Sequence, residues 1–303
     1  MRAIQRIAAA LAAIGLAMAP TARADDEPQV ERLSGTLAKV RASGVVTIAY
    51  RESSIPFSFL SQRGEPIGYS IELCRKLVEA MSEEVSRELE IKWLPVTSET
   101  RIEAIASGRA DLECGSTTSN LERGKRVAFS PVIFVSGTKL MVKRGSAIKS
   151  FRDLAGKTVV VTAGTTNEAA MREVSRRFKV DLRIAVARDH ADSFAQVVEG
   201  RADAFATDDV LLYGLIARNS KAGKFDVVGE FLSYDPYGIM FRRDDPQMRR
   251  LVAETFRELA DDGEIERQYK RWFMKPLPGG PALGLPMSPQ LESLVRAMAV
   301  RPE

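Results

Sequence analysis

Apolar and polar positions along the chain form blocks that predict strands followed by helices. Two apolar runs, 44–50 and 91–96, predict β-strands, and apolar residues at helical spacing over 69–81 predict a helix between them. A further helix, over 100–108, leads into a third strand at 110–116. Because strands that alternate with helices need crossover connections, the pattern predicts an α/β fold with largely parallel sheets.

The same pattern of helix and strand occurs twice. The sequence Gly-Arg-Ala-Asp stands at 108–111 and again at 200–203, each time after an apolar helix and before a strand that ends in polar residues. Two α/β units could resemble each other by chance, or the chain could contain two related lobes. We expect two related lobes.

The pattern changes where the chain is expected to pass between the lobes. Two short apolar runs, 138–144 and 237–243, belong to neither repeated unit. Residues 276–286 are rich in proline and glycine and predict an irregular segment, after which 288–299 could form a short amphipathic helix. The predicted division is lobe one at 25–137 and 238–275, lobe two at 143–235, and a C-terminal extension at 276–303.

Residues 1–24 have the pattern of a secretory signal peptide. A cationic start precedes an apolar stretch of about thirteen residues, and Ala22-Arg23-Ala24 supplies the small residues of a cleavage site. We therefore expect cleavage after Ala24 and a mature chain that is soluble in the periplasm. A buried N-terminal helix is the alternative. No later run approaches the roughly eighteen apolar residues that predict a membrane-spanning helix.

Charge and composition exclude several functional classes. The chain has 303 residues, of which 45% are hydrophobic and 28% charged, as is typical of globular domains. Because Arg2, Arg6 and Arg23 lie in the leader, its removal lowers the net charge from +4 to +1. The mature chain has no basic block, so we expect no nucleic-acid partner.

Two cysteines, Cys74 and Cys114, would enter an oxidising compartment, where a disulfide is permitted. Cys74 lies in a helical pattern and Cys114 at the end of a predicted strand. The sequence does not show whether their Cα atoms approach within the roughly 4.4 to 6.8 Å that a disulfide requires. A disulfide and two buried free thiols therefore both remain open.

Polar residues follow the predicted strands, at the edge where ligands bind in open parallel sheets. Those at strand ends and helix starts are Arg51, Ser98, Arg101, Ser116, Thr117, Thr118, Arg123, Thr165, Thr166, His190, Asp208 and Asp209. Helix N-termini and arginine side chains both bind carboxylates. Three arginines with one aspartate therefore predict a ligand with two negative groups and one positive group. Taken singly, an arginine could be a solvated surface residue and Ser98 a helix N-cap. His190 could be a structural residue close to Asp192, which we expect to cap a helix.

Six segments resemble the periplasmic solute-binding proteins of polar amino acid ABC transporters, most closely the glutamate/aspartate-binding subgroup. They are RESSIPFSF, VTSETRIEAIASG, DLECGSTTSNLERGKRVAFS, VVVTAGTTNEA, ARDHADSF and YKRWFMKPLP. The similarity extends from about residue 34 to 277. It implies a type II periplasmic-binding-protein fold, in which two α/β lobes joined by two hinge strands close on one amino acid.

The resemblance also implies which residues bind the part of the ligand that all amino acids share. Arg123 and the backbone N–H groups of Thr118 and Thr166 would bind the α-carboxylate. Asp208, the Thr118 hydroxyl and the Ser116 carbonyl would bind the α-ammonium. The aspartate that follows Asp208 could instead cap the next helix.

The ligand side chain would be selected by charge. The resemblance places Arg51, Ser98, Arg101 and His190 around a side-chain carboxylate. Members that bind neutral or basic amino acids often carry an acidic residue at the position of Arg51, where it would repel glutamate by several kcal/mol. Glutamate and aspartate differ by one methylene, worth only about 1 kcal/mol, so the sequence does not rank them.

The expected function is capture of L-glutamate or L-aspartate by a monomer that delivers it to a membrane permease. We expect no cofactor, no metal and no catalytic residue. One alternative is an exported, dehydratase-like enzyme of the same fold that acts on a small carboxylate, with His190 and a carboxylate as acid and base. Against it, the sequence has no nucleophile motif and no metal-ligand spacing. A further alternative is a module that presents the ligand signal to a sensor.

Overall fold

The computed structural model describes residues 32–219 and 222–300. The predicted leader and its cleavage site lie outside these residues. Residues from Leu33 onward form one compact unit. In the described part of the chain, no helix is long and apolar enough to cross a membrane.

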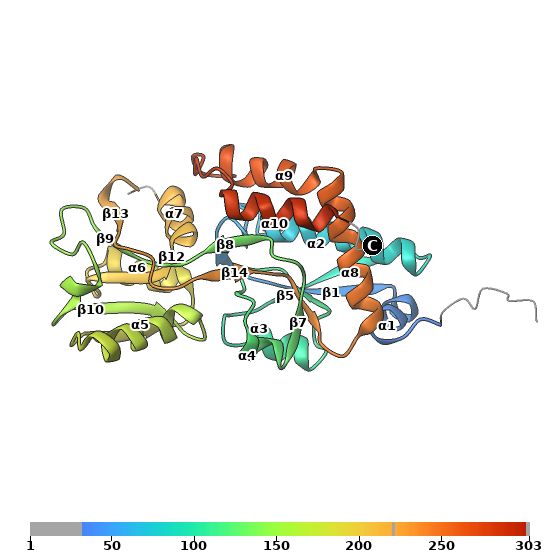
Figure 1. The fold of residues 1–303 in the computed structure, drawn as a ribbon, viewed down its shortest axis with the longest axis horizontal. Coiled ribbons are helices and arrows are strands. Elements are labelled where there is room, and N and C mark those ends of the chain that lie inside the picture. The colour runs from blue at the N-terminus through green and yellow to red at the C-terminus, as the bar shows by residue number, and fades with distance from the viewer. Residues whose placement is uncertain (1–31, 220–221, 301–303) are drawn as a thin grey trace, which may run out of the picture. The chain divides into compact units, whose positions relative to one another are not determined.

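Two five-stranded sheets with the same layout form the two lobes (Figure 1). The first has the order β5-β1-β6-β15-β7, with β1 Val45–Tyr50, β5 Glu90–Pro95, β6 Leu112–Glu113, β7 Val127–Phe129 and β15 Met240–Arg242. The second has the order β11-β10-β12-β9-β13, with β9 Thr138–Lys143, β10 Thr158–Thr162, β11 Arg183–Ala187, β12 Ala204–Asp208 and β13 Phe225–Val228. In each sheet the fourth strand runs antiparallel to its neighbours, and the first three are parallel. The prediction of two related α/β lobes is confirmed.

The apolar runs 138–144 and 237–243 contribute strands to the two sheets, so the prediction that they belong to neither repeated unit is wrong. They contain β9 and β15, the fourth strand of each sheet. Each enters its sheet directly from the segment that crosses between lobes, with no helix before it, so the pattern of alternating helices and strands did not include it. The crossing segments are β8 Phe134–Ser136 and β14 Asp235–Tyr237, which adjoin these runs in the chain, pair antiparallel with each other and belong to neither large sheet (Figure 1).

Helices cover both sheets. Those of lobe one are α1 Gly35–Ser43, α2 Tyr69–Glu84, α3 Arg101–Ala106, α4 Leu121–Gly124, α8 Pro246–Asp261 and α9 Glu264–Tyr269, and those of lobe two are α5 Thr166–Phe178, α6 His190–Val198 and α7 Asp209–Arg218. The predicted C-terminal helix is confirmed as α10 Pro289–Ala299, which packs against α8. Three short strands, β2 Ser53–Ser54, β3 Ser58–Leu60 and β4 Pro66–Ile67, form a small separate sheet.

The repeated Gly-Arg-Ala-Asp sequence has the same structural role in both lobes. Its glycine has a positive φ in each copy, 74° and 81°, which ends the preceding helix in a conformation that glycine adopts without strain. Its aspartate then accepts a hydrogen bond from the backbone N–H of a neighbouring strand residue. Asp111 accepts from Thr47 at 2.9 Å, and Asp203 accepts from Thr158 at 2.8 Å.

The hinge strands are held in the aromatic core of lobe one. The rings of Phe134 on β8 and Tyr237 on β14 lie 5.0 and 5.1 Å from the ring of Phe57, measured between centroids. All three side chains are buried. Each edge-to-face pair of this kind adds about 1 kcal/mol beyond area burial, so the hinge has a fixed position relative to lobe one.

Candidate ligand-binding site

The predicted site residues lie where strands end and helices begin. Arg51 directly follows β1, Asp208 ends β12, and Arg101, Thr166 and His190 are the first residues of α3, α5 and α6. All nine predicted residues except Thr166 are buried, with no more than 9% of the residue surface exposed. The interpretation of these arginines as solvated surface residues is therefore wrong for this structure.

Arg51 has the most demanding environment of the three arginines. Only 1% of its surface is exposed, and neither Nη1 nor Nη2 has a hydrogen-bond partner among the described residues. Its backbone is fixed by Ser58, whose hydroxyl accepts from the Arg51 N–H at 2.8 Å. Burying a cation without a partner is strongly unfavourable, so this guanidinium fits an anionic ligand group.

Other buried polar atoms near Arg51 also have unused hydrogen-bonding capacity. In the described part of the chain, the hydroxyls of Ser98 and Ser116 and the Nε of Arg101 have no partner. The other end of the Arg101 side chain donates from Nη1 to the Ser116 carbonyl at 3.4 Å. Unpaired buried donors of this kind are rare in folded proteins and are typical of places where a ligand completes the hydrogen bonding.

Burial and repulsion between neighbouring arginines both lower the pKa values of the arginines in this region. Burial and the neighbouring Arg101 lower the pKa of Arg51 to about 9. The same two causes lower the pKa of Arg123 to about 10. A bound carboxylate would reverse these shifts by favouring the charged guanidinium forms.

His190 is neutral in this environment. It is 2% exposed, and burial together with the charges of Arg51 and Arg101 lowers its pKa well below the ordinary value of 6.5. Its Nδ1 lies 2.9 Å from the Thr162 hydroxyl.

A cavity of about 120 Å³ lies next to this region. It is lined by residues of both lobes: Arg51, Thr97 and Thr100 of lobe one, and Arg188 and Asp189 of lobe two.

Arg123 connects the two lobes. Its Nη1 donates to the Thr118 carbonyl at 2.8 Å, within lobe one, and its Nη2 donates to the Gly164 carbonyl at 3.4 Å, in the loop before α5 of lobe two. The hydroxyls of Thr118 and Thr166 lie 3.3 Å apart across the same boundary. These contacts place the residues predicted for the α-carboxylate next to one another.

Asp208 is a buried carboxylate whose hydrogen-bond donors come from two elements. Asn167 of α5 donates from Nδ2 at 2.7 Å, and the Tyr237 hydroxyl of β14 also donates. Burial is the main reason that its pKa rises to about 7, and the nearby Asp235 carboxylate adds to the rise. A positive ligand group would stabilise the ionised form of Asp208, as the predicted ammonium contact requires.

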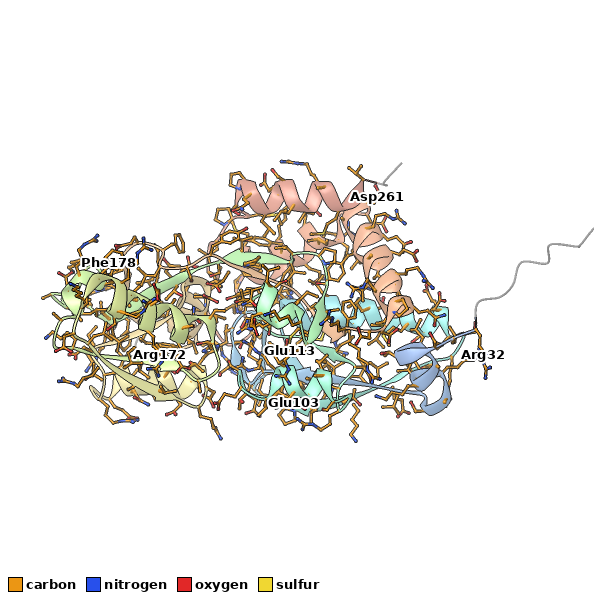
Figure 2. All side chains as sticks on the ribbon, turned by 60° about the horizontal axis from the view of Figure 1, so that its bottom comes forward. Arg32, Glu103, Glu113, Arg172, Phe178 and Asp261 are labelled. Carbon is orange, nitrogen blue, oxygen red and sulfur yellow. A yellow bond between two sulfur atoms is a disulfide. The ribbon has the colours of Figure 1, made fainter. Side chains whose placement is uncertain are left out.

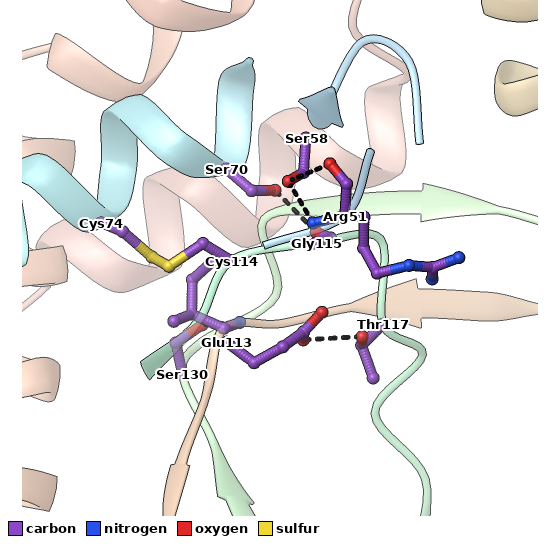
Figure 3. The surroundings of a disulfide bond; sticks show 10 residues. Arg51, Ser58, Ser70, Cys74, Glu113, Cys114, Gly115, Thr117 and Ser130 are labelled. Atoms are coloured by element: carbon purple, nitrogen blue, oxygen red, sulfur yellow. Dashed lines mark hydrogen bonds between the residues drawn. A yellow bond between two sulfur atoms is a disulfide. The ribbon is translucent and has the colours of Figure 1, made fainter. Parts of the chain in front are cut away.

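A disulfide anchors the loop that carries Ser116 and Thr118. Cys74 of α2 is bonded to Cys114, which directly follows β6, with the Cα atoms 6.3 Å apart. The Ser70 hydroxyl, also on α2, donates to the Gly115 carbonyl at 2.8 Å. Figure 3 shows both contacts, with the Arg51 guanidinium directed away from the disulfide. Of the two possibilities left open by the sequence, the structure has the disulfide.

The comparison with known proteins decides the family. A sequence model of the bacterial extracellular solute-binding proteins, family 3, matches residues 46–275. The chain belongs to this family. The predicted type II periplasmic-binding-protein fold and the predicted resemblance are both confirmed by that match and by the two sheets described above.

Relatives of this solute-binding protein are similar over most of their length. The glutamate/aspartate import solute-binding protein of Escherichia coli (strain K12) is 40% identical over 276 residues, which are 91% of this chain and 90% of the relative. The L-glutamate/L-aspartate-binding protein of Pseudomonas aeruginosa is 42% identical over 268 residues, 88% and 89% of the two chains. The solved structure of an ancestral amino acid-binding protein, a precursor of cyclohexadienyl dehydratase, has a TM-score of 0.68 and 29% identity, over 78% of this chain and 99% of that one. The two bacterial relatives are named as binding proteins, which favours transport over the enzyme alternative.

Two predicted local roles are wrong for this solute-binding protein. Ser98 is not the N-cap of the helix that follows, because that position is occupied by Thr100 and the Ser98 hydroxyl has no partner in the described residues. The cap of α6 is Asp189, whose carboxylate accepts from the Asp192 N–H at 2.9 Å, and not Asp192 itself.

Three buried polar residues near the site were not predicted. Glu113, at the end of β6, is fully buried, and its Oε2 accepts from the Thr117 hydroxyl at 2.8 Å. Glu103, in contrast, is exposed; both glutamates are labelled in Figure 2. Asp235 and Tyr237 come from hinge strand β14. Glu113 lies in a motif that the sequence singled out, but nothing in the pattern around 235–237 indicated that this segment faces the site.

Proposed function

We propose that this solute-binding protein captures L-glutamate or L-aspartate outside the cytoplasm, closes its two lobes on the ligand and delivers it to the permease of an ABC transporter. The names of its relatives support both the ligand class and the import role. β8 and β14 serve as the hinge, because they are the paired segments outside both large sheets. Closure would be stabilised by the ligand, which contacts both lobes and therefore binds the closed form more tightly.

The single observation that carries the ligand class is the environment of Arg51. Its guanidinium is buried, unpaired among the described residues and close enough to Arg101 for their charges to repel. A neutral or cationic ligand side chain would leave this charge without a partner. A carboxylate would provide two acceptors for it, and charge-assisted hydrogen bonds of this kind are about twice as strong as neutral ones.

Each end of the ligand then has a set of proposed partners. The side-chain carboxylate is bound by Arg51, Ser98, Arg101 and His190. The α-carboxylate is bound by Arg123 and the N–H groups of Thr118 and Thr166, and the α-ammonium by Asp208 with the Thr118 hydroxyl and the Ser116 carbonyl. Micromolar affinity corresponds to about 8 kcal/mol, which a few buried charge-assisted contacts supply.

We also propose that the chain is exported to the periplasm, with removal of the leader after Ala24. Support comes from the cationic start, apolar stretch and small residues of 1–24 and from the family membership. Mass spectrometry of the protein purified from the periplasm should give an N-terminus at Asp25. A retained leader, or a mature N-terminus elsewhere, would refute the proposed site.

Isothermal titration calorimetry against all twenty amino acids tests the proposed function. L-glutamate and L-aspartate should bind, and glutamine, arginine and apolar amino acids should bind at least about a hundredfold more weakly, because they leave Arg51 unpaired. Preference for glutamine would overturn the assigned ligand class. The proposal assigns the acidic ligand class, so tight binding of L-glutamate and L-aspartate in either order supports it.

A further inference from the structure

Asp235 brings together hydroxyl groups from both lobes. It lies on hinge strand β14 and is 1% exposed. Its Oδ1 accepts hydrogen bonds from Thr118 at 3.0 Å and from Thr166 at 2.8 Å, and its Oδ2 accepts from Ser233. Thr118 belongs to the loop after β6 in lobe one, whereas Thr166 begins α5 in lobe two. One hinge carboxylate is therefore hydrogen-bonded to both sides of the site.

These contacts determine the direction in which each threonine can hydrogen-bond. A carboxylate accepts hydrogen bonds and has no proton to donate, and a hydroxyl has one proton and two lone pairs. When Thr118 and Thr166 both donate to Asp235, their oxygens are left with lone pairs only. The two oxygens are 3.3 Å apart. A ligand group between or beside them must therefore be a donor.

A second residue of hinge strand β14, Tyr237, contacts Asp208 in the site. Asp235 and Tyr237 are two positions apart on β14, so their side chains leave the same face of the strand. Tyr237 donates to Asp208, the predicted ammonium partner. The Asp235 charge also raises the pKa of Asp208, which is consistent with the two carboxylates lying close together. Strand β14 thus contributes one carboxylate, Asp235, to the site and positions a second, Asp208, through the hydrogen bond from Tyr237.

We propose that Asp235 is a positioning residue that makes the site selective for the α-ammonium of the ligand. It accepts the hydroxyl protons of Thr118 and Thr166, so that both hydroxyl oxygens are free to accept hydrogen bonds from an N–H donor. It also adds a second negative charge near Asp208. This role rests on the proposed function, since it assumes an amino acid ligand. It also gives a role to a buried carboxylate at a hinge that otherwise packs through aromatic side chains.

Binding of two ligands to the wild-type protein and to variants at position 235 tests the proposal. L-glutamate carries the ammonium, and glutarate is the same dicarboxylate without it. In calorimetry, Asp235→Ala should weaken L-glutamate binding by about tenfold or more and change glutarate binding by less than about twofold. Asp235→Asn keeps an acceptor oxygen for the two threonines but lacks the charge, so its affinity for L-glutamate should lie between those of wild type and Asp235→Ala.

Equal weakening of L-glutamate and glutarate in Asp235→Ala would overturn the proposal, because it would indicate a general effect on closure or folding. If Asp235→Ala does not fold, Thr166→Val carries the same test, since Thr166 is only partly buried and valine preserves its shape. That variant should also lose L-glutamate affinity selectively, and an unchanged ratio of the two affinities would refute the role. Failure of the wild-type protein to bind any acidic amino acid would instead refute the proposed function.

Discussion

The Tyr237 hydroxyl donates a hydrogen bond to the Asp208 carboxylate and so links a hinge strand to the last residue of β12. Burial, and secondarily the charge of Asp235, raise the pKa of Asp208 to about 7. In the ligand-free protein this carboxyl therefore binds a proton more readily near neutral pH than an exposed aspartate does. Tyr237 remains a donor throughout, because burial and Asp208 raise its own pKa well above 10. Ligand binding and folding should consequently respond to pH in opposite directions.

We expect the affinity for L-glutamate to fall as the pH is lowered from about 8 to about 6. An ammonium ligand requires ionised Asp208, so below its pKa the protein must release a proton to bind, which weakens binding by up to about tenfold per pH unit. Calorimetry in buffers of different ionisation enthalpy would measure that proton release. Asp208→Asn should remove the pH dependence. Tighter binding at low pH would instead mean that protonation of His190 dominates.

The stability of the ligand-free protein should change with pH in the opposite sense. The folded-state pKa of Asp208 lies above its unfolded value of about 3.9, so the native state binds the proton more tightly. Its contribution to stability is fully present below the unfolded pKa and is lost as the pH rises through about 7. Comparison of thermal unfolding of wild type and Asp208→Asn between about pH 4 and 8 isolates this contribution, because the two states differ in bound protons between the unfolded and folded pKa values. A difference between the two proteins that does not vary with pH would contradict the assigned shift.

Replacing Arg51 by methionine should abolish recognition of acidic amino acids without destabilising the ligand-free fold. The substitution removes a buried cation that has no partner in the described residues and substitutes an apolar side chain of similar length. We expect a loss of about a hundredfold or more in L-glutamate affinity and an unchanged or higher Tm. Arg126→Ala is the matched control, since Arg126 is exposed and paired with Glu103. Wild-type affinity of Arg51→Met for L-glutamate would refute the proposal that the charge of Arg51 selects acidic ligands.

Arg123→Ala should weaken every amino acid ligand to a similar extent. The proposed contact of Arg123 is the α-carboxylate, which all amino acids share, and its guanidinium also connects Thr118 to Gly164 across the lobes. Calorimetry with L-glutamate, L-aspartate and the strongest non-acidic ligand would measure the three losses. If the loss were confined to dicarboxylic ligands, the roles of Arg51 and Arg123 would have to be exchanged.

Local sequence patterns predicted the parts of the site that belong to regular α/β units, and failed where distant segments meet. Arg51, Thr166 and His190 follow or begin elements with clear periodicity, so their position at the sheet edge could be inferred. Asp235 is in a short strand whose partners are distant in sequence: Asp235 pairs with Ser136 of β8, 99 positions earlier, and Tyr237 of the same strand forms a bridge with Thr118. Nothing local to such a strand reveals which face it presents to the site.

The same limit applies to charge. The sequence predicted three arginines and one aspartate at the site, but the described structure also brings Glu113 and Asp235 into that region. Burial depends on the completed fold and not on the residues nearby in sequence. The disulfide shows this limit as well, because the approach of Cys74 to Cys114 depends on how α2 packs beside β6.

Glu113→Gln tests whether this carboxylate offsets the charges of the arginines. Burial raises the pKa of Glu113, and the charges of Arg101, Arg51 and Arg123 act against that rise. The variant keeps an acceptor for Thr117 but loses the negative charge. We expect lower ligand-free stability, by about 1–2 kcal/mol, and L-glutamate affinity that is several-fold higher. An unchanged Tm and affinity would mean that Glu113 is already neutral in the wild-type protein.

Removal of the disulfide should lower stability and loosen the loop that carries Ser116 and Thr118, the proposed partners of the ligand α-carboxylate and α-ammonium. Cys74 and Cys114 are 40 positions apart, and closing a loop of that length in the unfolded chain corresponds to about 4 kcal/mol in the chain-entropy model. The Cys74→Ala, Cys114→Ala double variant should therefore unfold at a markedly lower urea concentration. Because the Ser70 contact to Gly115 still anchors the loop, L-glutamate affinity should fall only several-fold at temperatures where the variant remains folded. Reductant should shift the urea unfolding transition of the wild-type protein towards that of the variant and leave the transition of the variant unchanged. If complete reduction did not change the wild-type transition, the disulfide would not stabilise the fold.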